Sequence, residues 1–465
     1  MRCTACGAEL LMAEPHPFRC PAAKEGDDRD HILQRTLALD QASWPSDPSL
    51  NPFIRYRSLL HSYHHARSRG WSDQEFLELV TELDQSIASV DGTGFITPSP
   101  TTHTDIAPLS DKLVLHAKSE VAGVAGSHKA RHLMGIALQL AVSIRSDPSR
   151  PAPRLAIASC GNAALGAAVL ARALGWELTA FVPEDAETFI LDRLRELSVQ
   201  VQTCTRVAGQ LGDPCMSAFQ EAVVQGAIPF TVQGPQNGLC IEGGMTLGFE
   251  LAEQGRGWLD HGASGLFVQV GGGALVSACV LALREAQVMG VLKARPRLYC
   301  VQTKALHPLE RAWRRAATEL AGRLRESSTS ETPPTDGSAD AELAQWLCDR
   351  RESELSRAFL RELALCRSAW MQPWPNPATS LASGILDDET YDWRVPVEEM
   401  LLTGGRPVII SEAQVSAATT MSARELGVAA SPTGAAGLAG LLEWNTQAGT
   451  DSLEHATVLL TGGHS

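Results

Sequence analysis

From about residue 113 to the C-terminus, short apolar runs alternate with amphipathic segments of helical length. Such an alternation of strands and helices predicts an α/β fold in which helices cover both faces of a mostly parallel sheet. The predicted strands are 113–120, 154–160, 178–184, 201–206, 228–233, 266–272, 298–303 and 457–463. The predicted helices are 132–144, 163–175, 188–197, 216–226, 242–254, 274–287 and 436–444. Ligands of such sheets bind beyond the carboxyl ends of the strands, so the loops there are the candidate functional segments.

Charge and hydropathy narrow the class of partner. A formal charge of -14 argues against nucleic acid and against an anionic membrane surface, because both attract positive charge. Residues 264–283 carry no charge, but three consecutive glycines divide them into a strand, a turn and a helix, so no membrane span is expected. The N-terminus lacks the apolar core of a signal peptide, and the eleven cysteines do not resemble a secreted disulfide framework. A cytoplasmic protein is therefore expected.

The first 30 residues form a separate Cys-bearing segment. Cys3 and Cys6 have the spacing of a zinc knuckle, and Cys20 follows, but Ala23 stands where the partner of Cys20 would be. A zinc ion held by these three cysteines needs a fourth ligand, for which His16 and His31 are the candidates. A degenerate ribbon without metal is the alternative.

Two further regions interrupt the alternation. Residues 51–90 have helical spacing, with Ser72 as an N-cap and Glu75 three residues later. Residues 311–396 are predicted to be an insertion that acts as a lid, an interface or a substrate-selecting element, and the polar tract within 323–339 predicts a loop. Inside the insertion, the acidic run 387–393 is expected to be a solvent-exposed turn, although its carboxylates could bind a cation or an amino group.

Four loops carry the chemistry. In GSHKARH (126–132), Lys129 lies between a predicted strand and helix, where a buried amine can act as a nucleophile. In ASCGNAALGAA (158–168), the N–H groups at a helix start, together with Asn162, can hold a carboxylate; a tightly packed turn is the alternative.

The other two loops follow later strands. FVQVGGGALVSA (267–278) places three glycines between a strand and a helix, which suits a phosphate. A dinucleotide fingerprint would need another glycine where Val276 stands, so a monophosphate is favoured over NAD. In VLLTGGHS, Thr461 ends a strand and offers a hydroxyl.

In combination, these four loops resemble the fold type II (tryptophan synthase β-like) pyridoxal-phosphate enzymes, with the nearest similarity to threonine synthase and threonine dehydratase. The resemblance covers about 95–304 and 411–464. It implies two doubly wound, mostly parallel sheets with the cofactor cleft between them, plus a helical N-terminal extension. The implied domains are 1–30 (Cys-bearing), 31–92 (helical), 135–245 (small α/β), and 93–134 with 246–465 (large, cofactor-binding, including the insertion).

The resemblance also implies residue roles. Lys129 would hold pyridoxal 5'-phosphate covalently and move the Cα proton of the substrate. The other residues implied to bind the cofactor are His128, Asn162, Gly271, Gly272, Gly273, Ala274 and Thr461. The residues implied to bind the substrate are Ser127, Ser159, Cys160, Gly161 and Asn162. Two positions depart from the family pattern: His128 replaces an aromatic residue usual in threonine synthases, and Ala274 replaces a fourth glycine.

The implied activity is a lyase reaction on an L-amino acid by α,β-elimination or by elimination and replacement, of the threonine synthase kind. The alternatives are a serine or threonine dehydratase, a cysteine synthase-like β-replacement, or a non-catalytic protein that binds the cofactor for regulation. The expected partners are a small amino acid substrate and a second copy of the chain in a homodimer.

Overall fold

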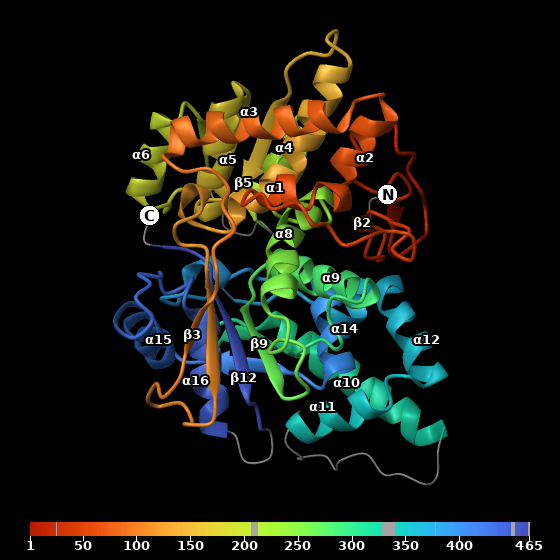
Figure 1. The fold of residues 1–465 in the computed structure, drawn as a ribbon, viewed down its shortest axis with the longest axis vertical. Coiled ribbons are helices and arrows are strands. Elements are labelled where there is room, and N and C mark those ends of the chain that lie inside the picture. The colour runs from red at the N-terminus through yellow and green to blue at the C-terminus, as the bar shows by residue number, and fades with distance from the viewer. Residues whose placement is uncertain (25, 206–212, 328–339, 377, 448–451, 464–465) are drawn as a thin grey trace.

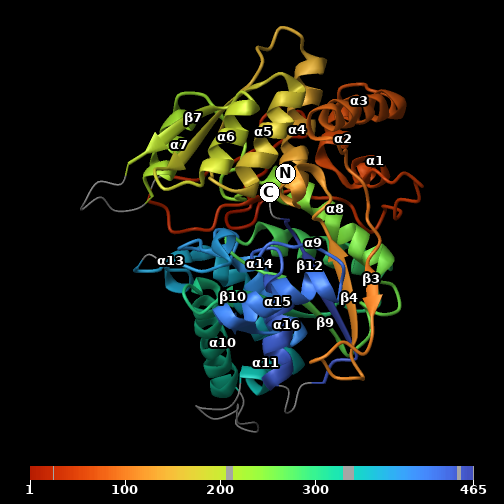
Figure 2. The same cartoon turned by 90° about the vertical axis from the view of Figure 1, so that its left-hand side faces the viewer.

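The computed structural model of the protein describes residues 1–24, 26–205, 213–327, 340–376, 378–447 and 452–463. Two halves, each built on its own sheet, lie one above the other, and helices α8 (Leu239–Gln254) and α9 (Ala274–Val288) run near their junction (Figures 1 and 2). This is the predicted α/β fold with two sheets.

The larger sheet has six strands in the order β11-β10-β9-β12-β4-β3. All neighbours pair in parallel except the edge strand β3, which is antiparallel to β4. Parallel pairing requires crossovers, and helices supply them on both faces. The strands are β3 (Thr101–His103), β4 (Val114–Ser119), β9 (Ser264–Gln269), β10 (Arg297–Thr303), β11 (Pro407–Ile410) and β12 (His455–Leu460).

The smaller sheet is fully parallel, in the order β7-β6-β5-β8. Helices α5 and α7 pack on its two faces, and α4 lies between α5 and α8. Its strands and helices are β5 (Arg154–Ala158), β6 (Glu177–Pro183), β7 (Gln200–Cys204), β8 (Ile228–Pro229), α4 (Lys129–Ser146), α5 (Asn162–Leu174), α6 (Thr188–Glu196) and α7 (Pro214–Val224).

The N-terminal region packs against the upper half of the molecule (Figure 1). The predicted capping box is confirmed at the start of α3, where Ser72 and Glu75 satisfy each other's backbone N–H groups. The elements of this region are β1 (Arg2–Cys3), β2 (Leu33–Gln34), α1 (Pro52–Arg55), α2 (His61–Ser68) and α3 (Asp73–Asp91).

The region predicted to be an insertion lies between β10 and β11 and is mostly helical. Helix α10 continues to Ser327, the first residue of the polar tract predicted to be a loop, and the rest of that tract, 328–339, lies outside the described residues. Arg206, the last residue of one predicted strand, also lies outside them. The helices from here to the C-terminus are α10 (Pro308–Ser327), α11 (Asp340–Asp349), α12 (Glu354–Glu362), α13 (Arg367–Trp370), α14 (Arg394–Thr403), α15 (Glu412–Arg424) and α16 (Ala436–Gln447).

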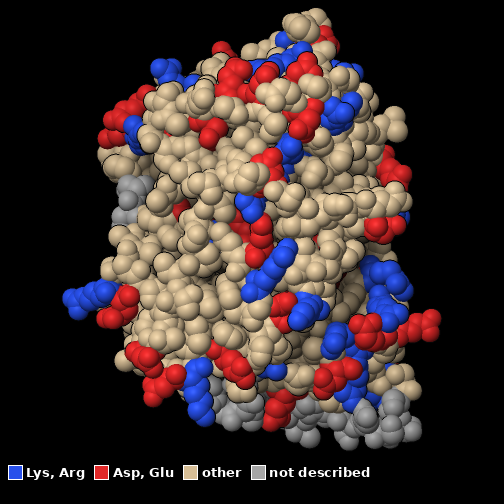
Figure 3. Space-filling model, in the orientation of Figure 1, with Lys and Arg blue, Asp and Glu red and all other residues tan. Residues whose placement is uncertain are grey.

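The surface agrees with the charge balance of the sequence. On the face shown in Figure 3, Lys and Arg side chains are scattered among Asp and Glu and form no continuous basic area among the described residues. None of the described helices combines the length and the apolar character that crossing a bilayer requires.

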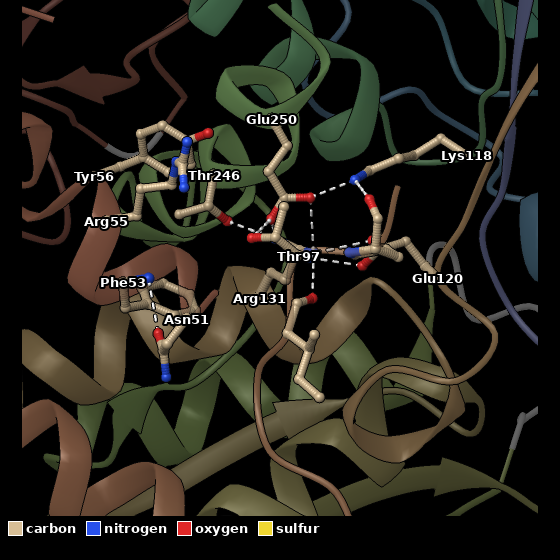
Figure 4. Close-up of polar contacts among 12 residues, drawn as sticks. Asn51, Phe53, Arg55, Tyr56, Thr97, Lys118, Glu120, Arg131, Thr246 and Glu250 are labelled. Atoms are coloured by element: carbon tan, nitrogen blue, oxygen red, sulfur yellow. Dashed lines mark hydrogen bonds and ion pairs between the residues drawn. The ribbon is translucent and has the colours of Figure 1, made fainter. Parts of the chain in front are cut away.

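A cluster of four buried charges joins β4, α4 and α8 (Figure 4). Arg131 pairs with Glu120 at 2.6 Å and with Glu250 at 2.7 Å, and Lys118 pairs with Glu250 at 2.6 Å. Thr97 donates a further hydrogen bond to Glu250. Two cations and two carboxylates balance, which offsets the high cost of removing each charge from water.

Replacing Arg131 with methionine should therefore destabilise the protein by about 3–5 kcal/mol, because it leaves two buried carboxylates with a single cation. Chemical denaturation measures this loss. The matched control is Arg145→Met on the same helix, where the pair with Glu82 is exposed and contributes at most about 1 kcal/mol. Equal losses in the two variants would contradict the balanced cluster.

Candidate active site

The four loops singled out in the sequence follow the carboxyl ends of β4, β5, β9 and β12, and three of them touch. Ser127 bridges to Gly462, and Gly463 N–H donates to Gly126 O at 3.1 Å. Gly462 also lies directly against the side-chain amide of Asn162. The lysine loop, the loop before α5 and the C-terminal loop therefore form one cluster.

Lys129 is the first residue of α4, and its surroundings are acidic. Burial lowers the pKa of its ammonium group, while the charges of Asp387, Cys240 and Asp392 oppose that shift. The backbone N–H of the preceding residue, His128, donates to Thr461 O at 3.2 Å, which fixes the start of the helix relative to β12. A lysine with a lowered pKa in such a place is a candidate nucleophile or general base.

The glycine loop after β9 has the conformation of an anion site. Gly273 caps α9 with φ of 91°, a left-handed conformation that favours glycine. Ala274 begins the helix and is not among the residues with positive φ, so a fourth glycine is unnecessary. The N–H groups at the start of a helix lack partners within the helix, which makes the start of α9 a candidate anion site.

The acidic run 387–393 lies against this loop, so its prediction as a solvent-exposed turn is wrong for the segment as a whole. A Cβ atom on Gly271 would stand 2.4 Å from Asp387 Oδ2, and one on Gly273 would stand 2.9 Å from Asp392 O. Asp392 N–H donates to Gly272 O at 2.8 Å. The expectation failed because the segment's polar backbone finds partners in the glycine loop, which its own sequence does not reveal.

Burial raises the pKa values of three of the four carboxyls in this segment, those of Asp387, Asp388 and Asp392. The pKa of Asp387 rises to about 6, although Lys129 and the Gly272 backbone N–H lower it. The pKa of Asp392 rises to about 7, although a hydrogen bond from Gly234 N–H at 3.1 Å opposes the shift. The predicted site residues did not include any of these aspartates.

Thr461 is buried, and the side-chain amide of Gln269 donates a hydrogen bond to its Oγ1. Gln269 ends β9 and thereby links the glycine loop to the C-terminal loop. Its signal in the sequence was a single polar residue in an apolar strand. The threonine oxygen acts as acceptor in this bond, which leaves the hydroxyl hydrogen available for another group.

The remaining predicted substrate-binding residues line the same cluster with different exposure. Ser127 is buried, and its hydroxyl has no partner among the described residues; the same holds for Nε2 of His128. Gly161 precedes α5 and donates to the Ser159 hydroxyl at 3.4 Å, while Cys160 is exposed. Unpaired buried polar atoms at a site are places for a ligand.

The N-terminal cysteines also come together, at a separate place. The ligand atoms of Cys3, Cys6, Cys20 and His31 all lie within 4.8 Å of one another. His16, the other candidate for a fourth ligand, instead stacks on Phe18.

The fold is similar to that of solved pyridoxal-phosphate enzymes. Maize serine racemase superposes with a TM-score of 0.53 at 16% identity, covering 83% of this chain and 93% of the racemase. Threonine deaminase isoform 2 from Solanum lycopersicum superposes with a TM-score of 0.51 at 16% identity, covering 85% of this chain and 91% of the deaminase. An L-serine ammonia-lyase from the fungus Rhizomucor miehei superposes with a TM-score of 0.50 at 16% identity, covering 79% of this chain and 95% of the ammonia-lyase. At these identities the similarity concerns the fold.

The family is shown by the sequence. Residues 93–350, more than half of the chain, match the family described as pyridoxal-phosphate dependent enzyme. The chain belongs to this family, which confirms the fold type II resemblance. A search of curated proteins finds no match.

The site residues fit this cofactor. Lys129 offers a buried amine, the left-handed Gly273 opens the start of α9 to a phosphate, and Ser127 and His128 have unpaired buried atoms. One group differs from a simple phosphate cradle: the Asp387 carboxyl lies against the same glycines.

The raised pKa of Asp392 predicts how stability depends on pH. Between about pH 4 and 7 the folded protein keeps a proton that the unfolded chain releases, so stability falls as pH rises through this window. The Asp392→Asn variant lacks this titrating group. Its free energy of unfolding, relative to that of the wild type, should therefore rise by about 2 kcal/mol when the pH is raised from 5 to 8. Thermal unfolding midpoints at the two pH values measure the gain; a pH-independent difference would contradict it.

Proposed function

We propose that this protein is a lyase that removes the β-hydroxyl of a hydroxy-amino acid by α,β-elimination and releases a keto acid and ammonia. The observation that carries the proposal is the position of Lys129, a buried amine of lowered pKa at a site bounded by a glycine loop and an uncharged Thr461. An amine in its neutral form can accept the Cα proton of the substrate.

The family resemblance supports the following roles for the chain's own residues. Lys129 would hold the cofactor and move the proton at Cα, and the N–H groups from Gly271 to Ala274 would hold the cofactor phosphate. Asn162 would contact the cofactor ring, while Ser127 and the segment Ser159–Gly161 would bind the substrate carboxylate through hydroxyl and N–H groups at the start of α5. Pyridoxal phosphate, when bound, supplies the electron sink that makes the Cα proton acidic.

Thr461 favours elimination over transamination. The Thr461 hydroxyl would hold the ring nitrogen of the cofactor, and an uncharged hydroxyl stabilises positive charge there less than a carboxylate would, so the ring would be a weaker electron sink. A substrate that expels its β-substituent promptly is suited to such a site, because negative charge need not persist at Cα.

The charges around the site favour a hydroxyl as the leaving group over a phosphate. Asp387 faces Lys129, and the charges of Asp388 and Asp213 act on Asp387 in turn. A second phosphate, as in the substrate of a threonine synthase, would meet these carboxylates at an electrostatic cost. The dehydratase reaction is therefore preferred to phosphate elimination from O-phosphohomoserine.

The first test mixes the cofactor-loaded protein with L-serine, L-threonine and O-phosphohomoserine in turn and measures keto acid, ammonia and phosphate. Keto acid and ammonia from a hydroxy-amino acid are expected, and the product should fall by at least about 1,000-fold in Lys129→Ala because the base is lost. Lys293→Ala, at an exposed lysine, is the control. Phosphate release alone would identify a threonine synthase-like reaction, and robust transamination would contradict the mechanism.

The homodimer remains a prediction from family analogy, and the cytoplasmic location remains a prediction from the sequence. Light scattering coupled to size exclusion tests the dimer directly.

A further inference from the structure

The cluster of Cys3, Cys6, Cys20 and His31 lies outside the residues that match the family, so nothing about the cofactor accounts for it. The four residues come from three separate parts of the N-terminal segment. Two backbone hydrogen bonds, Cys3 N–H to Ala8 O at 2.8 Å and Gly7 N–H to Cys3 O at 3.1 Å, form the tight turn that brings the first two cysteines together.

We propose that Cys3, Cys6, Cys20 and His31 bind one structural zinc ion. The Sγ atoms of Cys6 and Cys20 lie 3.6 Å apart, and Cys3 Sγ lies 3.3 Å from His31 Nδ1. Tetrahedral ligands with bonds of about 2.3 Å to sulfur stand about 3.8 Å from one another, so the spacing closely matches a zinc site. Three thiolates and one imidazole are a ligand set that zinc prefers.

The surroundings of His31 support the assignment independently of the cysteines. Its Nε2 lies 2.9 Å from Asp27 Oδ2, while Nδ1 faces the cysteines. A carboxylate that holds the distal nitrogen of a ligating histidine is a common second partner in zinc sites, because it fixes the ring and the tautomer. Cys3 and Cys20 are also buried, which suits a structural ion without an open position.

The experiment measures zinc by plasma mass spectrometry in the full-length protein, purified without metal-affinity chromatography. One zinc per chain is expected in the wild type and in the control Cys204→Ser, whose cysteine lies in the small sheet. Cys6→Ser and His31→Ala should each retain less than about a fifth of it, since a closed site needs all four ligands.

Cobalt replacement gives a second readout that does not depend on mutant folding. Wild-type protein refilled with cobalt should show the visible absorption of tetrahedral thiolate coordination. A wild type without zinc that also shows no such absorption, or a Cys6–Cys20 disulfide found by mass spectrometry, would overturn the proposal.

A different observation carries a second inference, which rests on the proposed cofactor site. The Asp387 carboxyl lies against Gly271, and the Gly272 backbone N–H interacts with it. These are the groups assigned to the cofactor phosphate. We infer that Asp387 competes with that phosphate for the glycine loop and so weakens cofactor binding.

Lys129 is the cation that faces Asp387, and Asp388 and Asp213 add negative charge around it. Two anions at one loop repel each other by several kcal/mol at a separation of about 4 Å, unless one is neutralised or displaced. The contacts of the flanking residues hold the segment in place, since Asp392 bonds to Gly272 and its carbonyl accepts from Ser277 Oγ at 2.9 Å.

The test is a titration of the cofactor-free protein with pyridoxal phosphate at pH 8, followed by absorbance. Asp387→Asn should bind at least about tenfold more tightly than the wild type, and the neighbouring control Asp388→Asn should change affinity less than about threefold. Equal affinities in wild type and Asp387→Asn would overturn only this inference. Absence of binding in every variant would overturn the proposed function as well.

Discussion

The buried charges of Lys118, Glu120, Arg131 and Glu250 are the constraint on which the site depends. Arg131 stands two residues after Lys129 on α4, and its two carboxylate partners are Glu120, directly after β4, and Glu250 on α8. The turn that carries the lysine is thus held between a strand of the large sheet and a helix at the junction of the two halves. A buried charge pair tolerates little displacement, because its attraction must offset the desolvation of every member.

The same constraint explains why two lysines on neighbouring elements have different roles. Lys118 is fully buried, but Glu250 and Gln254 satisfy its ammonium group. Lys129 has acidic neighbours at the site, but its side chain has no hydrogen-bond partner among the described residues. Burial lowers the pKa of both amines, but of the two only Lys129 lacks such a partner, which leaves its amine available to act as a nucleophile or base.

The sequence predicted those parts of the site that lie in local motifs. Lys129, the glycines from 271 to 273 and Thr461 each follow a strand, so the alternation of elements alone placed them at one edge of a sheet. The contribution of the insertion was not predictable, because Asp387 lies more than a hundred residues beyond Gly271 and its packing depends on long-range contacts. The sequence likewise could not distinguish His31 from His16 as the fourth ligand, because both histidines have acceptable spacing from Cys20. Only the structure places His31 beside the cysteines.

A chain of contacts joins the N-terminal segment to residues 387–393, which pack against the glycine loop. Asp30, next to His31, pairs with Arg367 at 2.8 Å, and Arg367 pairs with Glu389 at 2.9 Å and donates to Tyr391 O. Glu389 and Tyr391 lie in the segment that covers the glycine loop. Each of these ion pairs is at least partly buried. Displacing Asp30 would therefore remove one of the two carboxylates that pair with Arg367 and would weaken the attachment of Arg367 to that segment. The proposed zinc ion, by fixing His31, would therefore also restrict the position of Asp387 and would couple the order of the N-terminal segment to access to the proposed phosphate site.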